Sequence, residues 1–178
     1  MPSEPSRRLT SVIEVAITIA VASLLILWLS SSLSNRDLLW FWPVFDGQAS
    51  TITIYAQGQT VRLYPGDPGY DEMQATFNAE VAKHAGYYES FAPSQESVDY
   101  YRTQGLAVEV AYAKPTKVHN RFFFPEFDRL FVPLDGSYNY LGQPLLMRQF
   151  NGVWGPGVII LTSDAQIRAA AEQVLNSQ

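Results

Sequence analysis

The residues best suited to chemistry lie between Lys117 and Asp128, where the sequence reads KVHNRFFFPEFD. His119, Glu126 and Asp128 are side chains that can act as general acid and base in a hydrolase, and Arg121 could bind a carboxylate. Their spacing along the chain does not by itself bring them together. A catalytic site here would therefore depend on how the neighbouring segments pair.

Two predicted strands, 118–124 and 129–133, would bring these side chains together if they paired as a hairpin. The same hairpin also accounts for the residues without any chemistry. Alternation along the first strand points Arg121 and Phe123 to one face and Phe124 to the other, as at a sheet edge with charges in water and rings in the core. The pattern favours a structural hairpin over a catalytic site.

No catalytic or cofactor motif occurs elsewhere in the sequence. It contains no phosphate-binding loop ending in Lys-Ser or Lys-Thr, no GxSxG elbow and no HExxH pair. Its two histidines, His84 and His119, are far apart, and the lack of cysteine excludes disulfides, thiolate zinc sites and a cysteine nucleophile. We therefore predict no enzyme activity, no catalytic residue, no cofactor and no metal.

Aromatic residues are the second group with functional potential. Tyrosine and tryptophan are enriched at protein interfaces and can stack on sugars. Adjacent tyrosines on a helix cannot both face the core, so at least one of Tyr100 and Tyr101 should be exposed. The candidate interface residues are Tyr88, Tyr100, Phe123, Phe127, Tyr138, Tyr140 and Trp154. The alternative is a ligand- or glycan-binding groove lined by Tyr100, Tyr138, Tyr140 and Trp154.

The longest apolar run extends from Leu9 to Leu29 and contains one charged residue, Glu14. As a helix, a run of this length spans about 30 Å, the thickness of the hydrocarbon core of a bilayer. It is longer than the apolar region of a cleaved signal peptide, which favours an uncleaved anchor over cleavage. A twin-arginine signal is disfavoured because Thr10 and Ser11 stand where it needs apolar residues. The predicted membrane-interface residues are Arg7, Arg8, Trp28, Trp40 and Trp42.

This anchor divides the chain into four predicted segments. They are a cytoplasmic tail (1–8), a transmembrane anchor (9–29), an aromatic juxtamembrane linker (30–49) and a folded extracytoplasmic domain (50–178). The positive-inside tendency keeps Arg7 and Arg8 in the cytoplasm and the C-terminal domain outside. Rings of the linker would either rest on the outer leaflet or begin the core of the domain. The predicted location is the cell membrane, and an exported domain without disulfides favours a bacterial envelope.

The net charge of −5 belongs to the part of the chain beyond the anchor, because Arg7 and Arg8 cancel Glu4 and Glu14. An acidic domain repels the phosphate backbone of nucleic acids. The predicted partners are therefore the lipid bilayer, through residues 9–29, and another envelope or membrane protein, with no nucleic acid.

Alternating apolar and polar residues predict strands in the folded domain, and turn residues predict how they connect. Gln57-Gly58 joins Thr51–Ala56 to Thr60–Tyr64, and Asn151-Gly152 joins the segments on its two sides. A third strand is predicted from Leu106, ending at Lys114-Pro115. Strands joined by short turns are typical of an antiparallel sheet.

Three helices are predicted in the same domain. Asp71 should cap the first, with Gln74 completing a capping box, and Ser94 should cap a short helix over Gln95–Thr103. The last follows Ser163 or Asp164. Together the elements predict an α+β fold, a small domain with a mainly antiparallel sheet and helices packed on one face.

These observations favour a single-pass membrane protein whose extracytoplasmic domain binds another envelope protein as an accessory or assembly subunit. A ligand- or glycan-sensing ectodomain is the alternative. A hydrolase centred on His119, Glu126 and Asp128 is the least favoured. Pull-down of a partner tests the accessory subunit, and the position of the tyrosines tests the sensing ectodomain. The distances among these three side chains test the hydrolase.

Overall fold

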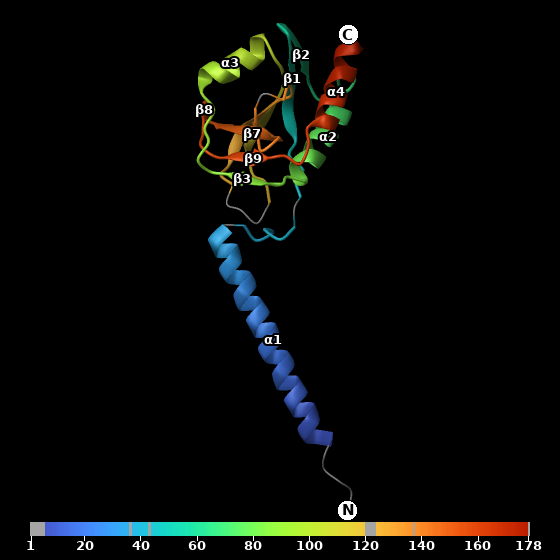
Figure 1. Ribbon diagram of the computed structural model, residues 1–178. Helices are drawn as coiled ribbons and strands as arrows, with labels where there is room; N and C mark the ends of the chain where they lie inside the picture. Colours follow the sequence, from blue (N-terminus) through green and yellow to red (C-terminus); the bar gives the residue numbers. More distant parts are fainter. Residues whose placement is uncertain (1–5, 36, 43, 120–123, 137, 178) are drawn as a thin grey trace, which may run out of the picture. The chain divides into compact units, whose positions relative to one another are not determined.

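The computed structural model describes residues 6–35, 37–42, 44–119, 124–136 and 138–177. Contacts between residues divide the described chain into a helical unit that ends at Trp42 and a sheet unit that holds the remainder. The sheet unit is a mixed α+β structure in which helices accompany a large antiparallel sheet (Figure 1).

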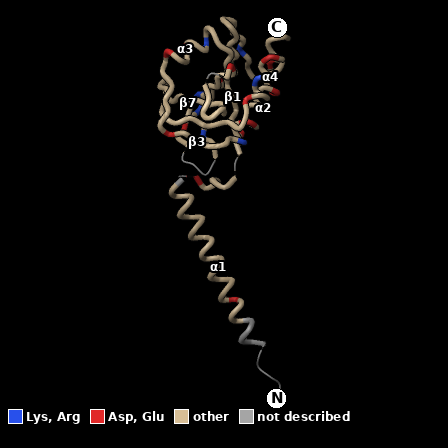
Figure 2. The backbone as a smooth tube through the Cα atoms, in the orientation of Figure 1, with Lys and Arg blue, Asp and Glu red and all other residues tan. Residues whose placement is uncertain are grey.

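The helical unit is dominated by α1 (Ser6–Asn35), a helix about 45 Å long at the usual rise per residue. Its segment Ser11–Ser34 has a mean hydropathy of 2.5 and is long enough to cross a membrane, although signal sequences and buried core helices meet the same criteria. Within this segment only Glu14 is charged (Figure 2). The helix continues past Leu29, and the Ser30 hydroxyl donates to the Leu27 carbonyl at 3.0 Å instead of interrupting it.

The sheet has the strand order β2-β1-β4-β5-β7-β9-β3, and β6 and β8 also pair with β7. Every pairing between described strands is antiparallel. The strands are β1 (Ala49–Ala56), β2 (Gln59–Leu63), β3 (Gly86–Tyr88), β4 (Leu106–Thr116), β5 (Phe127–Pro133), β6 (Asn139–Tyr140), β7 (Gln143–Phe150), β8 (Val153–Trp154) and β9 (Val158–Ile160).

Both predicted hairpin turns are confirmed, and their backbone angles explain the residues that form them. Gln57 and Gly58 join β1 to β2 with φ of 49° and 87°, and Asn151 and Gly152 join β7 to β8 with φ of 50° and 78°. Two consecutive residues with positive φ make a type I′ turn, whose twist matches that of the flanking strands. These turns fix the register of both hairpins.

The helices of the sheet unit are α2 (Tyr70–Ala82), α3 (Gln95–Thr103) and α4 (Ala165–Asn176). Ser94 caps α3 as predicted, since its hydroxyl accepts the Ser97 N–H at 3.1 Å. The predicted cap of α2 is wrong: Gly69 holds the N-cap position with φ of 83°, and Asp71 lies in the first turn. Gln74 does not complete a capping box, because its side-chain oxygen accepts the Ala49 N–H at 3.0 Å and ties α2 to β1.

Helices cover both faces of the sheet, which corrects the prediction that they pack on one face. One hydrophobic core includes α2, α4 and strand residues such as Val108 and Leu146. A second core includes α3 and strand residues on the opposite face, such as Phe131 and Met147. Several strands carry apolar residues at successive positions, so both faces need covering. Figure 1 places α3 on one side of the sheet and α2 with α4 on the other.

The predicted hairpin of 118–124 with 129–133 is wrong. Strand β4 continues through Pro115 to Thr116, which pairs with Phe127, so β5 lies between β4 and β7. Strands β4 and β7 occupy the two sides of β5, so neither side is left for the predicted pairing with segment 118–124. Phe127 is fully buried, at 0% exposure, and it contacts Phe45 and Tyr112 in the core.

The aromatic residues of the predicted linker divide between two environments. Phe45 is buried in the core of the sheet unit. Phe41 and Trp42, in the helical unit, are exposed, with 60% of Trp42 open to solvent. Phe45 thus begins the core of the sheet unit, as one of the two alternatives predicted, and a position of the other rings on the outer leaflet stays a prediction.

Candidate functional site

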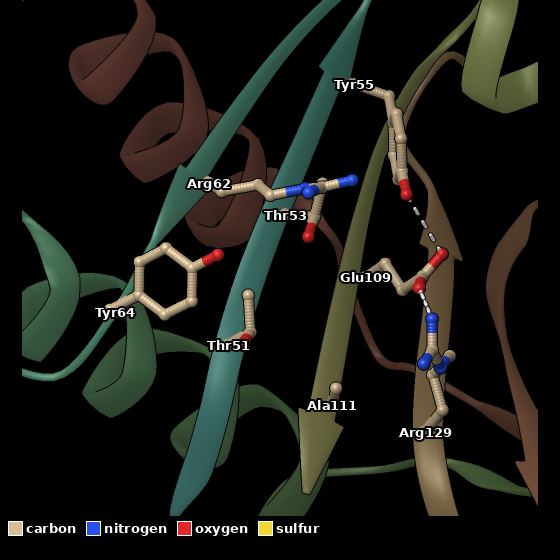
Figure 3. A pocket seen from close by; sticks show the side chains of 8 residues that line it. All are labelled: Thr51, Thr53, Tyr55, Arg62, Tyr64, Glu109, Ala111 and Arg129. Carbon is tan, nitrogen blue, oxygen red and sulfur yellow. Dashed lines mark hydrogen bonds and ion pairs between the residues drawn. The ribbon is translucent and has the colours of Figure 1, made fainter.

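A polar pocket lies on the α3 side of the sheet, where the helix leaves the strands uncovered. Helix α3 has only nine residues and contacts β1 and β4. Beyond it, polar side chains of four neighbouring strands surround a cavity of about 240 Å³ (Figure 3). We call this cavity the arginine pocket; it is lined by Thr51, Thr53, Tyr55, Arg62, Tyr64, Glu109, Ala111 and Arg129.

Strand register assembles the arginine pocket from residues far apart in the chain. Arg62 pairs with Thr53 across β2 and β1, and Thr53 pairs with Glu109 across β1 and β4. In the next cross-strand row, Ala111 pairs with Arg129. Directly opposed residues share one face of a sheet, so these side chains all point into the same space. The small side chain of Ala111 leaves the hollow between its larger neighbours.

Glu109 is the centre of the polar network, with only 3% of its surface exposed. Its Oε1 accepts a hydrogen bond from Arg129 Nη1. Its Oε2 accepts from Arg102 Nε at 3.0 Å and Nη2 at 2.8 Å, and from the Tyr55 hydroxyl at 3.3 Å. A buried carboxylate is stable only when its charge is paired and its lone pairs are satisfied. Two guanidinium groups and one phenol meet that requirement here.

The network keeps Arg102 and Tyr55 in fixed ionisation states at neutral pH. Burial lowers the pKa of Arg102, but the hydrogen bond and the charge of Glu109 outweigh it, so the pKa is raised overall. Burial, and then the negative charge of Glu109, raise the pKa of Tyr55 above its usual value. Arg102 therefore stays cationic and Tyr55 stays neutral. Arg102 also forms an ion pair with Asp99 at 3.2 Å, so two carboxylates face the two arginines.

Several donors around the pocket are unengaged. Arg62 is exposed, and Figure 3 shows its guanidinium reaching over Thr53. Among the residues that the structure describes, no partner bonds the side chain of Arg62 or the hydroxyls of Thr51 and Thr53. The pocket thus combines surplus positive charge with free donors in a chain whose net charge is −5. Such a site suits an anion with several acceptor oxygens, such as a carboxylate or a phosphate.

The predicted interface tyrosines lie on the same side of the sheet but in separate places. Tyr100 is 55% exposed while Tyr101 is buried, which confirms that the two face different ways. Tyr100 and Tyr138 line a second hollow of about 300 Å³ beside α3, where Tyr138 donates to Ser97 Oγ at 3.1 Å. This hollow is more open and has no arginine in its lining.

The remaining candidates occupy other positions. Tyr88 and Tyr140 are exposed and stack on each other, with 4.9 Å between ring centroids. Trp154 packs on Phe131 with 5.9 Å between centroids, below the Arg102 guanidinium. The four residues proposed for one aromatic groove therefore contact different neighbours, and only two share a hollow.

Two of the predicted surface phenylalanines do not contribute to a described surface. Phe127 is in the core, which corrects its assignment to an exposed patch. Phe123 lies outside the described residues. Of the predicted membrane-interface residues, Arg7 and Arg8 lie in α1, and the structure does not describe their side chains.

The three tryptophans among the predicted membrane-interface residues differ in exposure. Trp28 in α1 and Trp40 are half-buried, whereas Trp42 is exposed. The Trp40 indole N–H is buried with no acceptor among the described residues.

The side chains proposed for a hydrolase are not assembled by the strand pairing on which that hypothesis depended. Asp128 Oδ2 accepts the backbone N–H of Asn151 at 2.7 Å and so holds the turn between β7 and β8. Glu126 is exposed, and Arg121 lies outside the described residues. Within the described residues, Asp128 therefore has a structural role at this turn.

Sequence reasoning missed the arginine pocket. Its residues occupy the polar positions of alternating strands, which are usually assigned to water. The available signal was Glu109, a single carboxylate in the middle of an otherwise apolar strand. No family model matches the sequence, and neither the curated proteins nor the solved structures compared with it show significant similarity. The function must be argued from the geometry of the chain itself.

Proposed function

We propose that this chain is a single-pass membrane protein whose sheet unit, outside the cytoplasm, binds another protein of the cell envelope as an accessory or assembly subunit. Recognition occurs through an acidic group of that protein, which enters the arginine pocket. The protein carries out no reaction of its own in this proposal.

The unengaged donors of the arginine pocket, Arg62 with the hydroxyls of Thr51 and Thr53, carry the proposal. Glu109 already satisfies Arg102 and Arg129, so it holds them in place without leaving room for a further cation. Arg62 remains available, with the hydroxyls of Thr51 and Thr53 beside it. A guanidinium beside two hydroxyls can donate several hydrogen bonds to one carboxylate, which favours recognition of an acidic group.

Helix α1 supports the membrane part of the proposal. The segment Ser11–Ser34 is apolar, long and almost free of charge. Arg7 and Arg8 precede it, which by the positive-inside tendency favours a cytoplasmic N-terminus. A tether of this kind would hold the pocket near proteins of the same membrane.

The experiment is a pull-down from native membranes after mild crosslinking, with the full-length chain as bait. The wild type is compared with Arg62→Gln, which removes the available cation, and with Lys114→Gln, which removes an exposed cation outside the pocket. We expect a stoichiometric protein with the wild type and with Lys114→Gln, and at least tenfold less of it with Arg62→Gln.

Two outcomes would overturn this proposal. A protein captured equally by all three baits would bind elsewhere on the chain, and a bait that remains alone would remove the accessory-subunit role. In the second case a free anion becomes the candidate ligand, because the same pocket could accept a small carboxylic acid. Titration with succinate, with Arg62→Gln as the control, would then test the ligand-sensing alternative.

A further inference from the structure

Strand β2 forms an outer edge of the sheet, and it borders the arginine pocket. It pairs with β1 on one side, and no described strand pairs with its other side. An edge strand with free backbone groups is a template on which an extended segment of another protein can add a strand. The question is which groups of β2 are free.

The type I′ turn determines which backbone groups of β2 point outward. Ala56 and Gln59 close the two-residue turn, and antiparallel pairs alternate along the ladder between bonded and non-bonded. Gln59, Val61 and Leu63 therefore bond to β1, while the N–H and C=O groups of Thr60 and Arg62 face the open edge.

The open edge ends at Tyr64, directly after β2. The Tyr64 N–H donates to Asp67 Oδ2 at 2.7 Å, and the Tyr64 carbonyl accepts the Asp67 N–H at 2.9 Å. The turn that follows β2 thus uses the backbone of Tyr64 internally. Thr60 and Arg62 are the residues available for pairing, and they bring the edge directly to the arginine pocket.

Side chains of an added strand would meet different surroundings on the two faces of the sheet. On the pocket side they would lie beside Arg62, which has no partner among the described residues. On the opposite side they would lie beside Val61, which is half-buried against the larger core. Alternation in the added strand therefore requires an acidic side chain between two apolar ones.

We infer that β2 receives an extended apolar–acidic–apolar segment of a partner protein, which adds to the sheet at Thr60 and Arg62 and places its carboxylate in the arginine pocket. This inference rests on the proposed function, because it uses the same pocket. It adds the conformation and the sequence pattern of the bound segment. The positive charge of Arg62 favours an acidic segment, and the net charge of −5 on each copy disfavours a second copy of this chain as the partner.

The test measures binding of short peptides to the full-length chain in nanodiscs by fluorescence anisotropy. The parent peptide is acetyl-Thr-Val-Glu-Val-Thr-amide with a fluorophore. One variant replaces its Glu by Gln, and another carries N-methyl groups on its three central residues, which removes the backbone donors but keeps the carboxylate. We expect each change to weaken binding at least tenfold.

Protein variants test the same interaction from the other side. Thr60→Pro removes an outward N–H without removing a bond to β1, since proline is tolerated at an edge position. It should weaken binding of the parent peptide at least fivefold, Arg62→Gln at least tenfold and Lys114→Gln less than twofold. Thermal unfolding shows whether Thr60→Pro folds, and the N-methylated peptide on wild-type protein provides the answer if it does not.

The outcomes separate this inference from the proposed function. If the Glu-to-Gln peptide and Arg62→Gln lose binding but the N-methylated peptide binds like the parent, the pocket binds acidic groups and strand addition is overturned. If Arg62→Gln and the Glu-to-Gln change have no effect, or the parent peptide does not bind at millimolar concentration, the inference fails. Partner capture that still depends on Arg62 would then leave the proposed function standing.

Discussion

The two faces of the sheet are built from the same strands but serve different purposes. On one face, α2 and α4 cover a continuous apolar core in which Phe77, Leu130 and Leu134 are fully buried. On the other face, the short α3 covers only part of the strands, and the remainder carries Glu109 and its arginines. The covered face supplies stability, and the partly covered face has the free donors that recognition requires.

The largest expected effect comes from the covered face. Phe77 on α2 has 1% exposure, so Phe77→Ala should lower the free energy of unfolding by about 3–5 kcal/mol. Tyr100→Ala on α3 removes an exposed ring and should change it by about 0.5 kcal/mol or less. Denaturant unfolding of the full chain in detergent measures both, and equal losses would contradict the division between the faces.

The second effect tests whether the partly covered face contains a stabilising charge network. Glu109→Gln keeps the shape of the side chain but leaves Arg129 without its counter-charge and Arg102 with Asp99 alone. Removing one partner of a fully buried pair costs about 3–5 kcal/mol, and since both arginines reach solvent we expect about 2 kcal/mol. Glu126→Gln, at an exposed carboxylate, is the control and should leave the unfolding free energy unchanged.

The third prediction compares a tyrosine on each face at alkaline pH. Burial, and then the charge of Tyr70, raise the pKa of Tyr112 well above its usual value, whereas the pKa of Tyr55 is raised by burial and by Glu109. The unfolded chain loses these protons near pH 10 while the folded chain keeps them, so stability falls as pH rises beyond about 10, by up to about 1.4 kcal/mol per pH unit for each group.

Tyr112→Phe should therefore flatten the loss of stability between about pH 9 and about pH 11 more than Tyr55→Phe does. The Tyr112 hydroxyl has no hydrogen-bond partner among the described residues, so its removal should not destabilise the protein at neutral pH. Unfolding curves at several pH values provide the comparison. A steeper alkaline loss in Tyr112→Phe than in wild type would refute it.

The smallest effect on stability is expected at the residue with the largest expected effect on binding. Arg62 is exposed and makes no described ion pair, so Arg62→Gln should change the free energy of unfolding by about 0.5 kcal/mol or less. A large loss of stability would mean that Arg62 supports the fold, and the partner pull-down would then need reinterpretation. The same denaturation assay decides this.

Local patterns predicted local structure well. Helix α3 begins and ends where its cap and stop residues predict, and the Asn151-Gly152 turn forms as its sequence indicates. Both depend on interactions within a few residues, which a sequence displays directly. The predicted end of β4 at Lys114-Pro115 is wrong. Proline usually ends a strand, but Pro115 is exposed and β4 continues to Thr116.

The arginine pocket could not be predicted in this way, because it depends on strand order and register. Arg62, Glu109 and Arg129 come from three strands, and only the pairing of β1 with both β2 and β4, and of β4 with β5, places them together. Alternation along β4 places Glu109 on the face opposite Val108 and Val110. What it could not reveal is that Arg102, contributed by α3, closes over that carboxylate and buries it.

The packing of α2 against α4 has a consequence for how the protein is made. The two helices lie in separate parts of the sequence, and Gln173 of α4 donates to Glu72 of α2 at 3.3 Å across a separation of 101 residues. During synthesis the apolar stripe of α2 emerges long before its cover exists. The core between the helices is therefore completed only after the last helix is synthesised, and an intermediate without α4 exposes apolar surface of α2 that favours aggregation.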